Sequence, residues 1–151
     1  MFIGEYKQKM DTKGRVVVPS KFRDELGNTV VITKGVNEDC LFAFSKESWE
    51  KVAEKLGNLP MTNKKVSDFN RFFLAGANNL EADKLGRVLV PSALREHAQL
   101  DKEVVWVGVG NRMEIWDVDK WKDINAKFTG EATEESIDME ELSEYMAELG
   151  I

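Results

Sequence analysis

The sequence DTKGRVVVPSKFRDEL at residues 11–26 returns as DKLGRVLVPSALREHA at residues 83–98. Eight of the sixteen positions are identical, at a constant offset of 72 residues. The identical pairs are Asp11 with Asp83, Gly14 with Gly86, Arg15 with Arg87, Val16 with Val88, Val18 with Val90, Pro19 with Pro91, Ser20 with Ser92, and Arg23 with Arg95. Repetition of this length indicates an internal duplication. We therefore interpret the chain as two copies of one unit.

Each copy predicts a turn, a strand and a short helix, in that order. Gly14 lies between an aspartate and the β-branched run 16–18, where a glycine can adopt the positive φ of a tight turn. Pro19 cannot continue a strand ladder, so Ser20 is expected to N-cap a helix that stops at Gly27. The corresponding residues of the second copy are Gly86, Pro91 and Ser92.

Further along each copy, two apolar stretches separated by Gly and Asn predict a pair of strands. The stretches are 30–32 with 41–44, and 104–107 with 113–116. A helix is expected after each pair, capped by Ser45 in one copy and Asp117 in the other. We interpret Trp49 and Trp121, on the apolar stripes of these helices, as core anchors.

These elements predict a mainly β protein with packed helices, of the α+β class, organised in four parts. Residues 1–58 form the first repeat, 59–72 a connecting helix, 73–128 the second repeat, and 129–151 an acidic helical tail. Units of 55 to 60 residues are near the size at which a single core becomes marginal. We therefore expect strands to be buried against each other, either between the two repeats or between two chains.

The net charge of −6 comes from the end of the chain. Residues 129–151 hold eight acids and no base, which leaves residues 1–128 with 21 bases and 19 acids. The acids are Glu131, Glu134, Glu135, Asp138, Glu140, Glu141, Glu144 and Glu148. Asp138 and Glu141 have capping-box spacing, Leu142, Tyr145, Met146 and Leu149 form an apolar stripe, and Gly150 ends the expected helix.

The composition argues against several kinds of chemistry. One cysteine, Cys40, cannot form an internal disulfide, and Cys40 with the single His97 does not make a metal cluster. No catalytic residue is predicted, because Ser20 and Ser92 lack a repeated histidine partner. No metal or cofactor is predicted either. No apolar run reaches membrane-spanning length and no secretory leader is evident, so we expect a cytoplasmic protein that does not bind membranes.

The repeated turns carry residues suited to DNA. Lys13 and Arg15 flank Gly14, and the second copy keeps Arg87 beside Gly86. A two-stranded ribbon is narrow enough to enter the major groove, and arginine and lysine contact phosphates and base edges. The predicted DNA-binding residues are Lys7, Lys9, Lys13, Arg15 and Arg87. We expect Asp11 and Asp83, four residues before each arginine, to cap the turn and orient the guanidinium.

The duplicated D-x-x-G-R-V-x-V-P-S motif with its downstream helix arginine resembles the AbrB-type swapped-hairpin half-domain. The opening MFIGEYKQKMDTKGRVVVPSKFR and the stretch FFLAGANNLEADKLGRVLVPSALR resemble the MraZ family over essentially the whole chain. The resemblance implies swapped-hairpin β-barrel units. It also implies a nucleoid-associated transcriptional regulator of the bacterial division and cell-wall gene cluster, including its own promoter. Chains of the family assemble into rings and bind direct repeats in double-stranded DNA.

The two copies differ within this resemblance. Lys13 corresponds to Leu85, and Lys7 and Lys9 correspond to Asn79 and Glu81. These differences favour the first copy as the stronger DNA contact. The alternative reading is a non-enzymatic, self-assembling interaction scaffold, because exposed strands and an acidic amphipathic tail also suit self-assembly. A small-molecule enzyme is a third class that fold analogy alone does not exclude.

Overall fold

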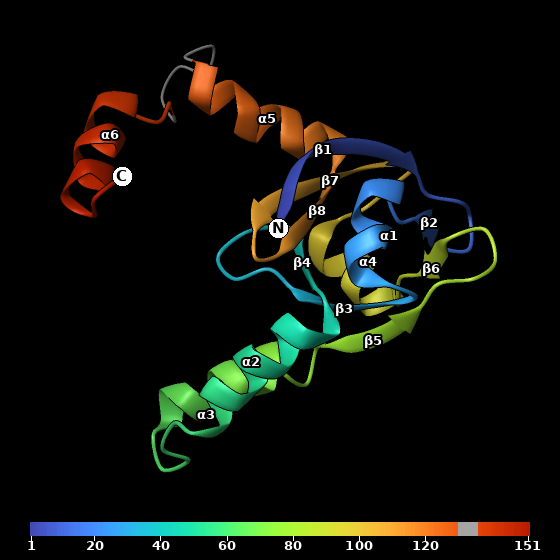
Figure 1. The fold of residues 1–151 in the computed structure, drawn as a ribbon, viewed down its shortest axis with the longest axis horizontal. Coiled ribbons are helices and arrows are strands. Elements are labelled where there is room, and N and C mark those ends of the chain that lie inside the picture. The colour runs from blue at the N-terminus through green and yellow to red at the C-terminus, as the bar shows by residue number, and fades with distance from the viewer. Residues whose placement is uncertain (130–135) are drawn as a thin grey trace. The chain divides into compact units, whose positions relative to one another are not determined.

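The computed structural model describes residues 1–129 and 136–151, which form two compact units. The first unit is Met1–Asp117 and the second is Val118–Ile151. Three acids of the predicted tail, Glu131, Glu134 and Glu135, lie outside the described residues. Strands and helices both occur in the first unit (Figure 1), so the predicted α+β class is confirmed.

A six-stranded antiparallel sheet and a separate two-stranded ribbon form the β structure of the first unit. The order in the sheet is β1 (Phe2–Lys9), β7 (Glu103–Gly110), β8 (Met113–Asp117), β4 (Leu41–Phe44), β3 (Thr29–Lys34) and β5 (Asn78–Glu81). The ribbon consists of β2 (Arg15–Val17) and β6 (Arg87–Leu89). We call this pair the β2–β6 ribbon.

Strands of the first repeat pair with strands of the second in four places, one of which is β4 with β8. β1 pairs with β7 over eight residues, β3 pairs with β5, and β2 pairs with β6. The chain also forms the expected hairpins within each repeat, β3 with β4 and β7 with β8. The first of the two expected arrangements, in which strands are buried between the repeats, is therefore confirmed.

The core lies between the sheet, the ribbon and two short helices, α1 (Ser20–Leu26) and α4 (Ser92–Ala98). Equivalent residues of the two repeats contribute side by side to one apolar cluster, as Val16 and Val88 do in the ribbon. Trp106 and Ile32 are its largest fully buried side chains. Cys40 is also buried, directly before β4, and burial raises the pKa of its thiol.

The predicted N-caps of α1 and α4 are wrong. Each helix begins at the serine itself, and the N-cap positions are occupied by Pro19 and Pro91, without a side-chain cap. The proline carbonyls instead accept hydrogen bonds from the first turn, for example from Phe22 N at 2.9 Å. Proline suits this position because it has no N–H to leave unpaired and its φ is fixed. The predicted stop at Gly27 is confirmed, with φ of 72°.

The first repeat ends with α2 (Lys46–Gly57), and the connecting segment that follows contains one helix, α3 (Lys64–Phe73). Ser45 and Asn63 cap these helices through their side chains. Trp49 packs on Phe73, with ring centroids 5.4 Å apart, yet neither Trp49 nor Trp121 is buried. The interpretation of these tryptophans as core anchors is therefore wrong, because the strands of the two repeats already fill the core.

The second unit contains α5 (Val118–Thr129) and α6 (Met139–Glu148). α5 starts directly after Asp117, whose carboxylate accepts a hydrogen bond from Asp101 N at 3.2 Å. Asp138 caps α6 by accepting from Glu140 N and Glu141 N, as the capping-box spacing indicates. Most of the predicted stripe is exposed, with Tyr145 at 56%. None of the described helices is long and apolar enough to cross a membrane.

Candidate nucleic-acid interface

The first turn is organised around Asp11. Its Oδ1 accepts hydrogen bonds from Lys13 N at 3.0 Å and Arg15 N at 2.9 Å, and its Oδ2 accepts one from Arg15 Nε at 2.6 Å. These bonds, first of all the one from Arg15 N, lower the pKa of Asp11 to about 2. One carboxylate thus both closes the turn and holds the guanidinium.

The second turn repeats this geometry around Asp83. Its Oδ1 accepts from Leu85 N and Arg87 N, both at 2.9 Å, and its Oδ2 accepts from Arg87 Nε at 2.8 Å. The pKa of Asp83 is also lowered, chiefly by the bond from Arg87 N. Leu85 therefore occupies in the second turn the position that Lys13 occupies in the first.

Gly14 and Gly86 lie where the two repeats cross. Their φ values are 90° and 76°, in the region that favours glycine. A Cβ on Gly14 would lie 2.6 Å from Arg95 Nε, and a Cβ on Gly86 would lie 2.8 Å from Arg23 Cζ. The helix arginine of each repeat thus covers the turn of the other. Arg23 and Arg95 are identical residues at equivalent positions of the two copies, which is the sequence signal that marks them. The sequence does not show that each contacts the turn of the other repeat.

The β2–β6 ribbon turns its two central valines inward and its arginines outward. Val16 and Val88 are paired at its centre and buried, whereas Arg15 pairs with Leu89 and Val17 with Arg87. Because side chains alternate along a strand, Arg15 and Arg87 share the outer face of the ribbon. About a third of each side chain is exposed. Figure 1 shows β2 and β6 on one side of the unit, away from α2 and α3.

The three lysines predicted to bind DNA are all exposed but not all on the ribbon. Lys13 lies in the first turn, beside Arg15. Lys7 and Lys9 lie on β1, where Lys9 is in register with Glu103 of β7. The structure thus brings Lys13, Arg15 and Arg87 together around the ribbon, while Lys7 and Lys9 belong to a neighbouring strand.

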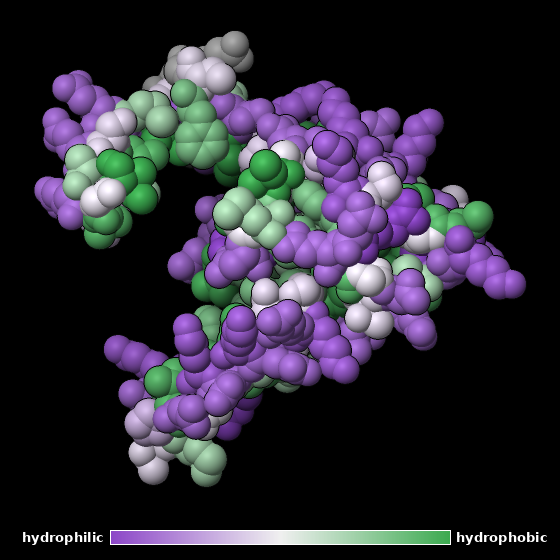
Figure 2. All heavy atoms as spheres, viewed as in Figure 1, coloured by the Kyte–Doolittle hydropathy of each residue, from purple (hydrophilic) through white to green (hydrophobic). Residues whose placement is uncertain are grey.

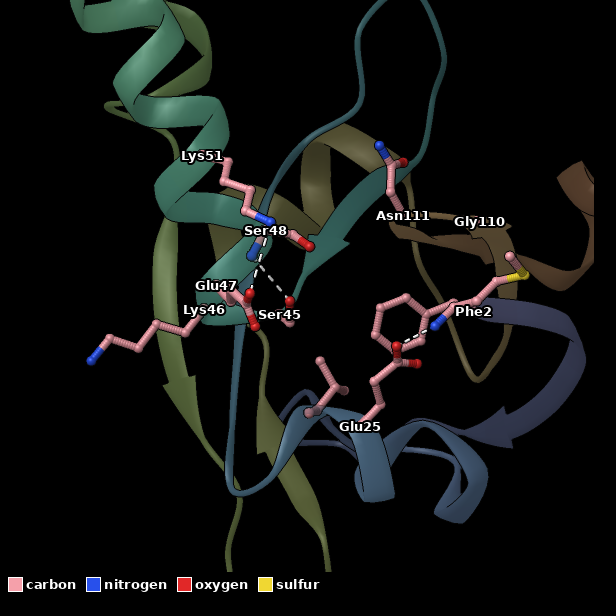
Figure 3. Close-up of a pocket in the computed structure, with 11 residues that line it drawn as sticks. Phe2, Glu25, Ser45, Lys46, Glu47, Ser48, Lys51, Gly110 and Asn111 are labelled. Carbon is pink, nitrogen blue, oxygen red and sulfur yellow. Dashed lines mark hydrogen bonds and ion pairs between the residues drawn. The ribbon is translucent and has the colours of Figure 1, made fainter.

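A pocket of about 610 Å³ lies elsewhere on the unit, between the start of β1, the end of α1 and the start of α2 (Figure 3). Several of the polar groups that line it are held in structural contacts. Glu25 pairs with the amino group of Met1, and Ser45 Oγ caps α2 by accepting from Ser48 N at 3.2 Å. Glu47 lies 3.7 Å from Lys51 Nζ. These are structural contacts, and they do not arrange a nucleophile with a base.

The fold and the turns define a class of protein: a duplicated, swapped-hairpin α+β protein whose two repeats build one arginine-bearing ribbon. The family profile described as "MraZ protein, putative antitoxin-like" matches residues 1–72 and again residues 73–141. The chain belongs to the MraZ family.

Curated relatives are similar along their full length. A protein of Clostridium acetobutylicum is 46% identical, and proteins of Acetivibrio thermocellus and Caldicellulosiruptor saccharolyticus are each 48% identical. Each alignment covers all of both chains, and each relative is named "Transcriptional regulator MraZ". The family is thus named for transcriptional regulation, which is a non-enzymatic function.

Proposed function

We propose that this chain is a sequence-specific DNA-binding transcriptional regulator whose β2–β6 ribbon enters the major groove. The observation that carries this proposal is the pair of aspartate-held arginines on one narrow, outward face. A two-stranded ribbon fits the major groove, whose base edges distinguish all four base pairs. The names of the full-length relatives support the same function.

The way in which each aspartate holds its arginine leaves part of the guanidinium free to contact a base. Among the described residues, the ion pairs of Arg15 and Arg87 with their aspartates use Nε. The terminal Nη atoms therefore remain for a ligand, and an arginine can bond the O6 and N7 of guanine in a bidentate manner. We assign base contacts to Arg15 and Arg87, and phosphate contacts to the lysines. The first turn is the stronger contact because it has Lys13 where the second has Leu85.

In this proposal residues 1–58 and 73–128 supply the DNA face, and residues 129–151 serve assembly. The regulated DNA includes direct repeats in the chain's own promoter, within the division and cell-wall gene cluster, which places the protein on the nucleoid. The carboxylates of the acidic tail are not expected to contact the DNA, since they would repel phosphates. The similarity to relatives named as transcriptional regulators supports the regulatory part of this proposal.

We also propose that the chain works as a ring-like homo-oligomer. Several ribbons in one closed assembly raise the effective concentration of each successive DNA contact. The exposed apolar stripe of α6 supports this, because it offers surface for a neighbouring chain. Light scattering at micromolar concentration should show an oligomer, and deletion of 129–151 should reduce its size. A monomer that still binds DNA tightly would contradict the proposal.

A gel-shift assay tests the DNA function. The full chain should bind the DNA upstream of its own gene, more weakly at higher salt. Arg15→Ala should weaken binding by about 1 to 3 kcal/mol and leave the fold intact. Arg87→Ala should have a smaller effect, and Lys51→Ala, on the exposed side of α2, serves as the matched loss of one cation. Unchanged binding by Arg15→Ala would overturn the assignment, and salt-insensitive binding of a protein partner alone would favour the scaffold.

A further inference from the structure

Two large apolar side chains, Leu85 and Leu89, are exposed beside the arginines of the ribbon. Leu85 is 66% exposed and Leu89 is 54% exposed. Leu89 is in register with Arg15, and it lies two residues after Arg87 on the same strand. Cross-strand partners and alternate residues share a face, so Leu89 lies among the two arginines on the outer face. In Figure 2, apolar and charged residues both reach the surface where Figure 1 places β2 and β6.

The backbone of the ribbon is closely symmetric, but its side chains are not. Arg15 corresponds to Arg87, and Val16 and Val88 pair at the centre. Under the same correspondence Lys13 becomes Leu85, although both backbone N–H groups bond the turn aspartate in the same way. Half-buried Val17 becomes the larger and more exposed Leu89. Each half of the face therefore carries one arginine, beside which the first half adds the cation of Lys13 and the second adds two apolar side chains.

We propose that Leu85 and Leu89 are specificity-determining residues that contact thymine methyl groups in the major groove. This inference rests on the proposed DNA function. Thymine is the base that presents a methyl group there, and apolar side chains recognise it by contact. In the complex each arginine contacts a base, Lys13 of the first turn neutralises a phosphate, and Leu85 and Leu89 contact methyl groups, so one chain lies on its DNA in one orientation.

Another copy of the chain is the competing occupant for these leucines. The arrangement favours DNA, because a protein that covered Leu89 would also desolvate the neighbouring guanidinium of Arg15 and would have to supply acceptors for it. A major groove offers both an apolar methyl group and base-edge acceptors within one or two base pairs. DNA by itself therefore supplies a partner for both the leucines and the arginines of this face.

The test compares thymine with uracil, which lacks only the methyl group. The full-length protein first selects its tightest duplex from a random 20-base-pair pool, and each thymine of that duplex is then replaced by deoxyuridine. Affinity should fall about fourfold for each contacted methyl group. Leu85→Ala or Leu89→Ala should lose affinity for the thymine duplex and show no further loss at the uracil position that it would contact. Ile3→Ala, which removes a side chain of equal exposure (67%) from β1, should keep the full preference for thymine.

A second variant tests the asymmetry. Leu85→Lys gives the second turn the lysine that the first turn has at Lys13. The variant should bind unrelated DNA more tightly, and the slope of its log affinity against log salt concentration should be steeper by about 1. Equal wild-type affinity for thymine and uracil duplexes would overturn the inference. So would leucine variants that lose the oligomer and weaken both duplexes equally, since that result assigns the leucines to a protein interface. Failure to enrich any duplex would instead overturn the proposed DNA function.

Discussion

Asp11 does two things with one carboxylate, and its titration can separate them. The depressed pKa means that folding favours the ionised form. Its stabilising effect on the turn is therefore complete above the ordinary pKa of 3.8 and is lost as the pH falls toward about 2. The largest cause is the backbone N–H of Arg15, with the guanidinium in a lesser role.

We predict that Arg15→Ala raises the pKa of Asp11 only partly. The backbone N–H groups of residues 13 and 15 remain in the variant, so the carboxyl should still titrate below 3.8. Carboxyl-carbon NMR measures this, and Asp83 in the same spectra provides an internal control that should not move. An Asp11 pKa at its ordinary value in Arg15→Ala would show that the ion pair, rather than the turn, holds the carboxylate.

At the scale of elements, each turn depends on a helix from the other repeat. Arg95, which lies over Gly14, is itself held by a 3.0 Å hydrogen bond from its Nε to the carbonyl of Val90. It cannot move aside without losing that bond. Gly27 also has a positive φ, of 72°, but a Cβ there would meet nothing within 4 Å. A substitution at Gly27 therefore tests backbone strain alone, whereas one at Gly14 tests strain together with the contact between the repeats.

We predict that Gly27→Ala costs about 1 to 3 kcal/mol of unfolding free energy, from backbone strain alone, because φ of 72° with ψ of −139° is a conformation that non-glycine residues rarely adopt. Gly14→Ala should cost more, by about a further 1 to 3 kcal/mol, because the new Cβ displaces Arg95. Urea denaturation followed by circular dichroism measures both. Arg95→Ala combined with Gly14→Ala should show less than the sum of the single costs. Equal costs for the two glycine variants would show that Arg95 does not constrain the turn.

Local elements were predictable from the sequence, and their long-range partners were not. Gly14 predicts a turn, Gly27 the end of a helix and Ser45 a helix cap, because each of these depends on residues only a few positions away. Ser20 was assigned the wrong position because proline and serine both suit a helix start, one residue apart. That strands are shared, between the repeats or between chains, was expected from the small size of the repeats. The pairing of β2 with β6, and the place of Arg95 over Gly14, depend on contacts between residues about 72 apart.

The whole first unit is one fold made by two repeats, each of which lacks strand partners alone. Without the second repeat, β1 would lose its pairing with β7, β3 its pairing with β5, and β2 its pairing with β6. The apolar cluster would also lose Val88, Val90 and Trp106. An open sheet edge and half a core do not make a stable monomer.

We predict that residues 1–72 alone do not form a folded monomer. They should be unfolded by circular dichroism, or should associate so that two copies replace the missing strands. Sedimentation at several concentrations distinguishes these states, and residues 1–117 serve as the control that should fold. A cooperatively folded monomer of residues 1–72 would contradict the shared architecture.

Hydrogen–deuterium exchange with and without the selected duplex tests most directly whether the two repeats form one DNA-binding face. The full-length protein in complex should show slowed exchange in residues 11–18 and 83–90 together, with α2 and α3 unchanged. Protection of both segments is expected because β2 and β6 are paired and their arginines share one face. Protection confined to α2 and α3, or to the first turn with β6 unaffected, would contradict this account.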